Sequence, residues 1–161
     1  MHILEEKAES IGFASQAVIK TKELIFVDEY RLFCEDNYCG NYDKLPMCPP
    51  ECGTVEELHQ RVMKYENVLV LQTIWDTTNR ETDADYKKMK QQHNTLTYEL
   101  VKLAEDSGYE GLVITAGPSA HASCMSAYCI DAAKMAESCG MKYICGEHKV
   151  AFFSQFCFNE N

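Results

Sequence analysis

The sequence lacks a long apolar run and an excess of basic residues, and each absence excludes a class of protein. The longest apolar run is far shorter than the roughly twenty residues that cross a bilayer, so no membrane-spanning segment is predicted. The 161 residues include 15 Lys and Arg against 25 Asp and Glu, a formal net charge of −10. This charge argues against general binding to nucleic acid or to anionic membranes, because both need a basic surface.

Common motifs of catalysis are also missing. The chain contains no nucleophile elbow, no glycine-rich phosphate loop and no paired-carboxylate signature. Asp83 and Asp85 fit the acidic first turn of a helix better than a catalytic pair. The sequence therefore leans away from an enzyme, and an enzyme with an open metal position ranks as the third hypothesis.

Cysteine, by contrast, is abundant, with nine residues. The amino-terminal stretch MHILEEKAES has no basic segment followed by an apolar one, so no secretory signal is predicted and a cytoplasmic location is expected. Disulfides are rare in the reducing cytosol, so a cysteine-rich chain there is expected to bind metal. Cys157, within FFSQFCF, is instead expected to be a small buried hydrophobic residue.

Four of the cysteines fall within the nineteen residues from Cys34 to Cys52, at spacings C-x4-C-x8-C-x3-C. The residues between them are polar and interrupted by glycine and proline, so this loop cannot order itself by burying apolar surface. A bound metal contributes its binding energy directly to folding such a loop. Cys34, Cys39, Cys48 and Cys52 are therefore the first group of predicted metal ligands.

The type of metal is indicated less strongly than its presence. Soft thiolates select iron–sulfur clusters, zinc or copper(I). The C-x4-C and C-x3-C pairs fall within the range of zinc sites. A C-x4-C pair and a cysteine followed by proline, here Cys48-Pro49, also occur in iron–sulfur motifs. Ligand chemistry favours an iron–sulfur cluster with zinc second, and Tyr38 and Tyr42 are expected to pack over the centre.

A second, looser group consists of Cys124, Cys129, Cys139 and Cys145. Cys129 and Cys139 bound a predicted helix and would lie about 15 Å apart, so they cannot share a mononuclear metal. Cys124 and Cys129, in a predicted loop over residues 117–129, are the second pair of candidate ligands. His121 is a further candidate, although an exposed turn histidine is the more common alternative.

Hydrophobic periodicity predicts helices over residues 3–11, 54–65, 83–106 and 129–139, and strands over 13–20, 68–75, 110–116 and within 141–153. This alternation predicts an α/β fold: one layered domain over residues 1–161, with a small, mostly parallel sheet flanked by helices and an inserted cysteine-rich metal loop at 34–52. The apolar run Val68–Leu71 predicts a strand buried on both faces. Functional loops gather at the carboxyl ends of strands in open α/β sheets, so this loop is expected to meet the turn after Ala116.

Several of these residues together form a motif: an arginine–leucine–x–cysteine lead-in, a second cysteine, a tyrosine, cysteine–proline–proline, and a later strand ending in glycine–proline. They are Arg31, Leu32, Cys34, Cys39, Tyr42, Cys48, Pro49, Pro50, Gly117 and Pro118. The pattern resembles the DUF2284 family of predicted metal-binding proteins, and the resemblance implies metal binding without supplying an activity. The chain departs from that family at Ser119, where a cysteine is usual, and Cys124 and Cys129 are candidate replacements. Cys52 has no family counterpart, so its predicted role rests on spacing alone.

Two functions follow as hypotheses. The first is a cytoplasmic iron–sulfur protein in electron transfer or redox sensing. The alternative is a structural zinc module that presents a protein-interaction surface. Both hypotheses predict a protein partner, and neither predicts binding to nucleic acid or to a membrane. Both are compatible with a homo-oligomer.

Overall fold

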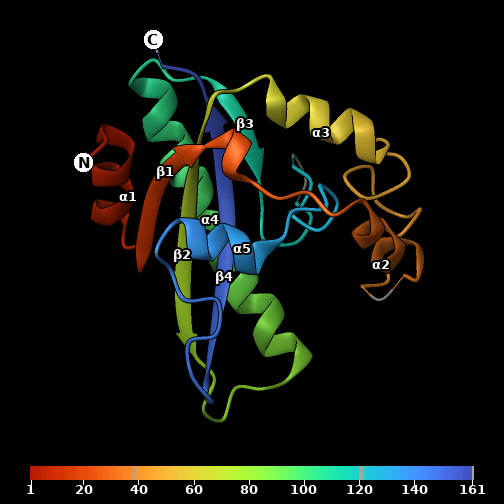
Figure 1. Ribbon diagram of the computed structural model, residues 1–161. Helices are drawn as coiled ribbons and strands as arrows, with labels where there is room; N and C mark the ends of the chain where they lie inside the picture. The colour runs from red at the N-terminus through yellow and green to blue at the C-terminus, as the bar shows by residue number, and fades with distance from the viewer. Residues whose placement is uncertain (38, 120–121, 161) are drawn as a thin grey trace.

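The computed structural model describes residues 1–37, 39–119 and 122–160 (Figure 1). In chain order the elements are α1 (Ile3–Ile11), β1 (Ser15–Lys20), η1 (Thr21–Glu23), η2 (Asp28–Tyr30), α2 (Arg31–Glu35), α3 (Val55–Met63), β2 (Asn67–Asp76), α4 (Asp83–Asp106), β3 (Gly111–Ile114), α5 (Ala132–Ser138) and β4 (Lys149–Phe158).

The sheet has the strand order β1-β2-β4-β3, and every neighbouring pair is antiparallel. The prediction of a mostly parallel sheet is therefore wrong. The helical crossover that favoured it does exist: α4 connects β2 to β3, and these two strands run in the same direction because both are antiparallel to β4. However, β4 lies between them and splits the βαβ unit. The predicted last strand ends at residue 153, whereas β4 continues to Phe158, and its second half pairs with both β2 and β3.

Both faces of the sheet are covered, as the apolar run in β2 predicted. Val68, Leu69, Val70 and Leu71 are all fully buried. Because side chains alternate along a strand, Val68 and Val70 face a core that includes residues of α3 and α5, whereas Leu69 and Leu71 face a core that includes residues of α1 and α4. Figure 1 shows α5 in front of the strands and α4 behind them. An uninterrupted apolar strand thus indicates two covered faces and not the direction of its neighbours.

The helix boundaries follow local capping chemistry. A capping box starts α3: Thr54 Oγ1 accepts from Glu57 N at 3.1 Å and Glu57 Oε1 accepts from Thr54 N at 3.1 Å. The helix predicted over 129–139 begins only at Ala132, because Asp131 caps it and Cys129 has φ +60°. No helix among the described residues is both long enough and apolar enough to span a membrane.

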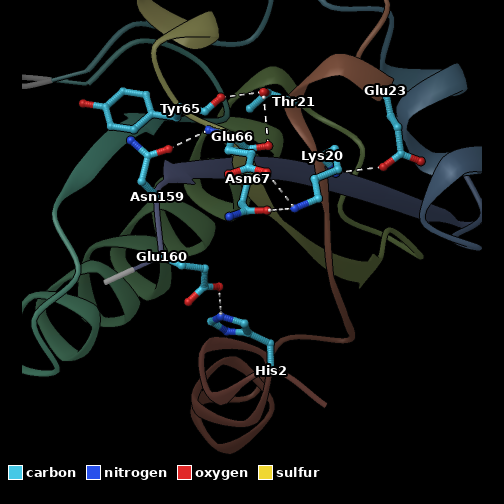
Figure 2. A network of polar contacts seen from close by, with 9 residues as sticks. All are labelled: His2, Lys20, Thr21, Glu23, Tyr65, Glu66, Asn67, Asn159 and Glu160. Atoms are coloured by element: carbon cyan, nitrogen blue, oxygen red, sulfur yellow. Dashed lines mark hydrogen bonds and ion pairs between the residues drawn. The ribbon is translucent and has the colours of Figure 1, made fainter.

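Polar contacts connect one end of the sheet to residues near both ends of the chain (Figure 2). Lys20 Nζ donates to Asn67 Oδ1 at 2.9 Å, and Glu66 N donates to Asn159 Oδ1 at 2.8 Å. His2 Nε2 lies 2.6 Å from Glu160 Oε1, which joins the start of α1 to the residues after β4. This end of the molecule is therefore fastened without the cysteine-rich loop, which Figure 1 shows beside α2 and α3, on the opposite side from α1.

Candidate metal centre

Four cysteine thiols line one cavity of about 740 Å³ between the loop and α4. Cys34 belongs to α2, Cys39 and Cys48 belong to the loop, and Cys124 follows β3 in the second cysteine-bearing segment. Gly117 lines the same cavity, so the expected meeting of the cysteine-rich loop with the turn after Ala116 is confirmed. All nine cysteines lie in the described part of the chain and are free thiols.

The loop is built from successive turns rather than from an apolar core. Asn37 N donates to Cys34 O at 2.9 Å, and Asn37 Oδ1 accepts from Tyr42 N at 2.9 Å. The Asn37 backbone has φ +59°. Asparagine tolerates this left-handed conformation better than most residues. Further along, Cys52 N donates to Cys48 O at 3.1 Å. These short-range hydrogen bonds place the cysteine-bearing backbone locally.

Arg31 joins three segments around the site. Its Nη1 donates to Gly53 O at 2.8 Å, at the end of the loop, and its Nη2 donates to Ala127 O at 2.9 Å, beyond Cys124. Only the planar guanidinium presents two donors in this fixed fork. The arginine of the lead-in motif therefore connects α2 and Cys34 to both neighbouring loops.

Cys124 is positioned next to the end of β3, although nine residues lie between it and the last residue of that strand, Ile114. Thr115 forms a parallel bridge with Cys124. Thr115 N donates to Ser123 O at 3.1 Å, and Met125 N donates to Thr115 O at 3.3 Å. Residues 123–125 thus lie beside Thr115, and Cys124 lines the cavity together with the cysteine-rich loop.

Burial disfavours the thiolate form of two of these cysteines. Burial raises the pKa of Cys34 to about 11 and that of Cys48 to about 11, and in both cases the nearby Cys124 contributes to the increase. The Arg31 guanidinium opposes this effect at Cys34. Thiols with such pKa values are protonated at neutral pH, and a bound cation would stabilise their thiolate forms and release the protons. Four free thiols on one cavity are a donor set that fits a thiolate-bound metal group.

The other predicted ligands do not line this cavity. Cys52 is 7% exposed and packs in the core beneath α3 and α5. Cys129 is fully buried, with its Sγ 3.9 Å from Asp28 O and from Ala127 O. Their ligand roles stay predictions, as does that of His121, which with Tyr38 lies outside the described residues, whereas Tyr42 lines the cavity. Within residues 1–37, 39–119 and 122–160, no three His, Cys, Asp or Glu side chains converge closely enough to hold one metal ion.

The opposite wall of the cavity is not predicted by the sequence. It is formed by α4 residues at positions 83, 86, 87, 90, 91 and 94. These positions recur with helical spacing and form one stripe along α4, which is polar except for Tyr86. Hydrophobic periodicity predicts the helix, and no pattern in the sequence indicates that this stripe faces the thiols.

The fold and the thiol-lined cavity define a candidate thiolate metal site, and a comparison of sequences places it in a family. The chain belongs to the DUF2284 family, described as predicted metal-binding proteins, whose model matches residues 17–121, or 105 of the 161 residues. The matched region contains the four cysteines from Cys34 to Cys52 and ends three residues before Cys124. No curated protein and no solved structure matches the chain.

Proposed function

We propose that this protein holds an iron–sulfur cluster on Cys34, Cys39, Cys48 and Cys124 and uses it in electron transfer or redox sensing in the cytoplasm. The observation that carries the proposal is that these four thiols line one cavity. Four cysteine ligands are the usual set for such clusters. Membership of a metal-binding family supports the presence of a metal, and the cavity supports this choice of ligands.

The size of the cavity favours a cluster over zinc. A single tetrahedral zinc draws four sulfurs to about 2.3 Å from one point. Here no three His, Cys, Asp or Glu side chains of the described residues converge on one point, and the four cysteines line a cavity of about 740 Å³. In a cluster, the cysteines bind two or more different iron atoms, so their sulfurs lie farther apart than around a single zinc ion. The spacing that supported zinc also paired Cys48 with Cys52, and Cys52 does not line the cavity.

The residues of this chain would hold the cluster and shield it from water. When bound, the cluster supplies one-electron redox chemistry. Cys48 is only 4% exposed, and the neighbouring Pro49 is buried and has no N–H to satisfy. Cys39 is exposed and gives the site one side open to solvent. A protein that donates or accepts the electron would approach from that side.

The proposal is tested on protein purified without oxygen, by its visible absorption spectrum and by analysis of iron, sulfide and zinc. We expect a coloured protein containing iron and acid-labile sulfide. Cys34→Ser, Cys48→Ser and Cys124→Ser are each expected to lose most of the colour and iron, because each removes one of four ligands.

Matched controls are available within the same chain. Cys139→Ser and Cys145→Ser change half-buried thiols that do not line the cavity, and Cys52→Ser removes the spacing-based candidate. All three are expected to retain iron and sulfide. A colourless protein with stoichiometric zinc would overturn the proposal in favour of the structural module. Loss of iron in Cys52→Ser but not in Cys124→Ser would overturn the ligand assignment.

A further inference from the structure

The cavity has two chemically different walls. One carries the four thiols, and the other is the polar stripe of α4, which includes Lys87 and Lys90 together with Asp83. The ion pairs among the described residues are His2–Glu160, Lys20–Glu66 and His148–Glu81, so neither of these lysines is paired with a carboxylate there. In a chain of net charge −10, two such cations on one cavity call for an anionic occupant.

The α4 wall is fixed in place. Asn94 Nδ2 donates to Ala116 O at 2.9 Å, and Ala116 N donates to Asn94 Oδ1 at 3.0 Å, which fastens the middle of α4 to the end of β3. A Cβ at Gly117 would meet Lys90 Cδ at 2.8 Å, so this glycine leaves room for the lysine stem. The Lys90 ammonium also lies 5.9 Å from the centroid of the Phe152 ring. The Lys90 stem therefore packs against Gly117 at the cavity, and its ammonium lies near the Phe152 ring.

The cavity is larger than a cluster alone requires. Eight iron and sulfide atoms at about 30 Å³ each, the share of one water molecule in the liquid, would occupy about 240 Å³. The total volume of about 740 Å³ leaves room of the order that small organic ligands occupy. Lys87 and Lys90 of α4 line this same cavity.

We propose that the α4 wall binds a small anion, a carboxylate or a phosphate, through Lys87 and Lys90, directly beside the thiolate centre. The position next to the centre rests on the proposed function. The cationic wall itself does not, because the two Asn94–Ala116 hydrogen bonds hold α4 against the turn after β3. The site would then bring a small anionic molecule into contact with the cluster, and not only a protein that exchanges electrons with it.

The test uses cluster-loaded protein without oxygen at low ionic strength, titrated calorimetrically with inorganic phosphate and, separately, with succinate. We expect one of the two probes to bind at one site per chain and to change the visible circular dichroism of the cluster. The probe that binds more tightly identifies phosphate or carboxylate as the preferred group. The double variant Lys87→Gln/Lys90→Gln should weaken that binding by about tenfold or more, because both charge-assisted contacts are lost.

The control is Lys88→Gln/Lys102→Gln, which makes the same change in net charge on exposed residues of α4 that do not line the cavity. It should bind the probe as the unchanged protein does. Equal weakening in both double variants, or no binding of either probe, overturns the proposal. A shift in the reduction potential of Lys87→Gln/Lys90→Gln without any probe binding also overturns it, since the lysines would then only balance the charge of the cluster. If the protein proves colourless, the proposed function fails, and the same titrations on the reduced, metal-free protein still decide whether the lysine wall binds anions.

Discussion

Two parts of this chain are stabilised by different interactions. The sheet half consists of the four strands with α1, α3, α4 and α5, and the cysteine-rich half is the loop from Cys34 to Gly53. In the sheet half, long elements bury apolar side chains on both faces of β2 and β4. In the cysteine-rich half, the residues from Cys39 to Cys52 form a series of turns after the short helix α2, and Arg31 connects this loop to its surroundings. The sheet half should therefore fold without a metal, whereas the cysteine-rich half should become fully ordered only when one binds.

The largest expected effect is in the sheet core. Phe156 is fully buried in β4, with its ring stacked on Phe158 at 6.0 Å between centroids. Phe156→Ala should lower the free energy of unfolding of the metal-free protein by about 3–5 kcal/mol, because it removes a large side chain and leaves a cavity. Urea unfolding followed by far-ultraviolet circular dichroism measures this loss.

Cys48→Ser provides the comparison, since it alters a buried residue of the other half. In metal-free protein it should change the same unfolding free energy by less than about 1 kcal/mol, because the loop contributes little to the cooperative core. If Cys48→Ser lowers the free energy of unfolding of the metal-free protein as much as Phe156→Ala does, the two halves unfold as one cooperative unit. The division into two halves would then be wrong.

The next effect belongs to a polar group inside the sheet half. His93 is fully buried, with Nδ1 2.7 Å from Thr73 Oγ1 and Nε2 2.9 Å from Ser154 Oγ. Burial lowers the pKa of His93 to about 4 from its usual 6.5. The unfolded chain therefore takes up this proton at a higher pH than the folded one. Stability should fall as pH decreases from about 6.5 towards 4, by about 3 kcal/mol in total.

Urea unfolding of metal-free protein at a series of pH values between 7 and 4 measures that slope. His93→Gln should be less stable at pH 7 and should also lose most of this pH dependence. His148→Gln, which changes an exposed histidine near Glu81, should retain it. An unchanged slope in His93→Gln would show that other groups cause the acid sensitivity.

The two halves also differ in how far the sequence predicts them. Periodicity and capping located α1, α3, α4 and most of β2 because the signals that define them are local. Strand direction was predicted wrongly because it depends on where β4 inserts, which is a choice among long-range pairings. At the site, spacing alone grouped Cys48 with Cys52. The structure instead brings Cys124 to the cavity through its bridge with Thr115, and no local pattern encodes that bridge.

A smaller effect is expected at the junction of the two halves. Arg31→Lys keeps the charge but cannot donate to Gly53 O and Ala127 O together. We expect local opening of residues 34–53 to become easier by about 2 kcal/mol, with little change in global unfolding. Native-state hydrogen exchange distinguishes local opening of this loop from global unfolding. Arg80→Lys, which alters an arginine that donates to the neighbouring Asp76 O, should leave the exchange of that loop unchanged. Equal exchange in both variants would remove Arg31 from its proposed role.

The smallest effect tests whether the boundary between the halves lies at Gly53 or inside α3. Thr54 and Thr82 are both threonine caps with reciprocal partners, Glu57 and Asp85, at the starts of α3 and α4. Thr54→Ala and Thr82→Ala should each cost about 1 kcal/mol of unfolding free energy. Because α3 packs in the sheet core through Leu58, the Thr54→Ala cost should be the same with and without metal. If the cost grows when metal is bound, the first turn of α3 is ordered together with the cysteine-rich loop. The boundary between the halves would then lie beyond Thr54, at the first residue of α3 that contacts the sheet.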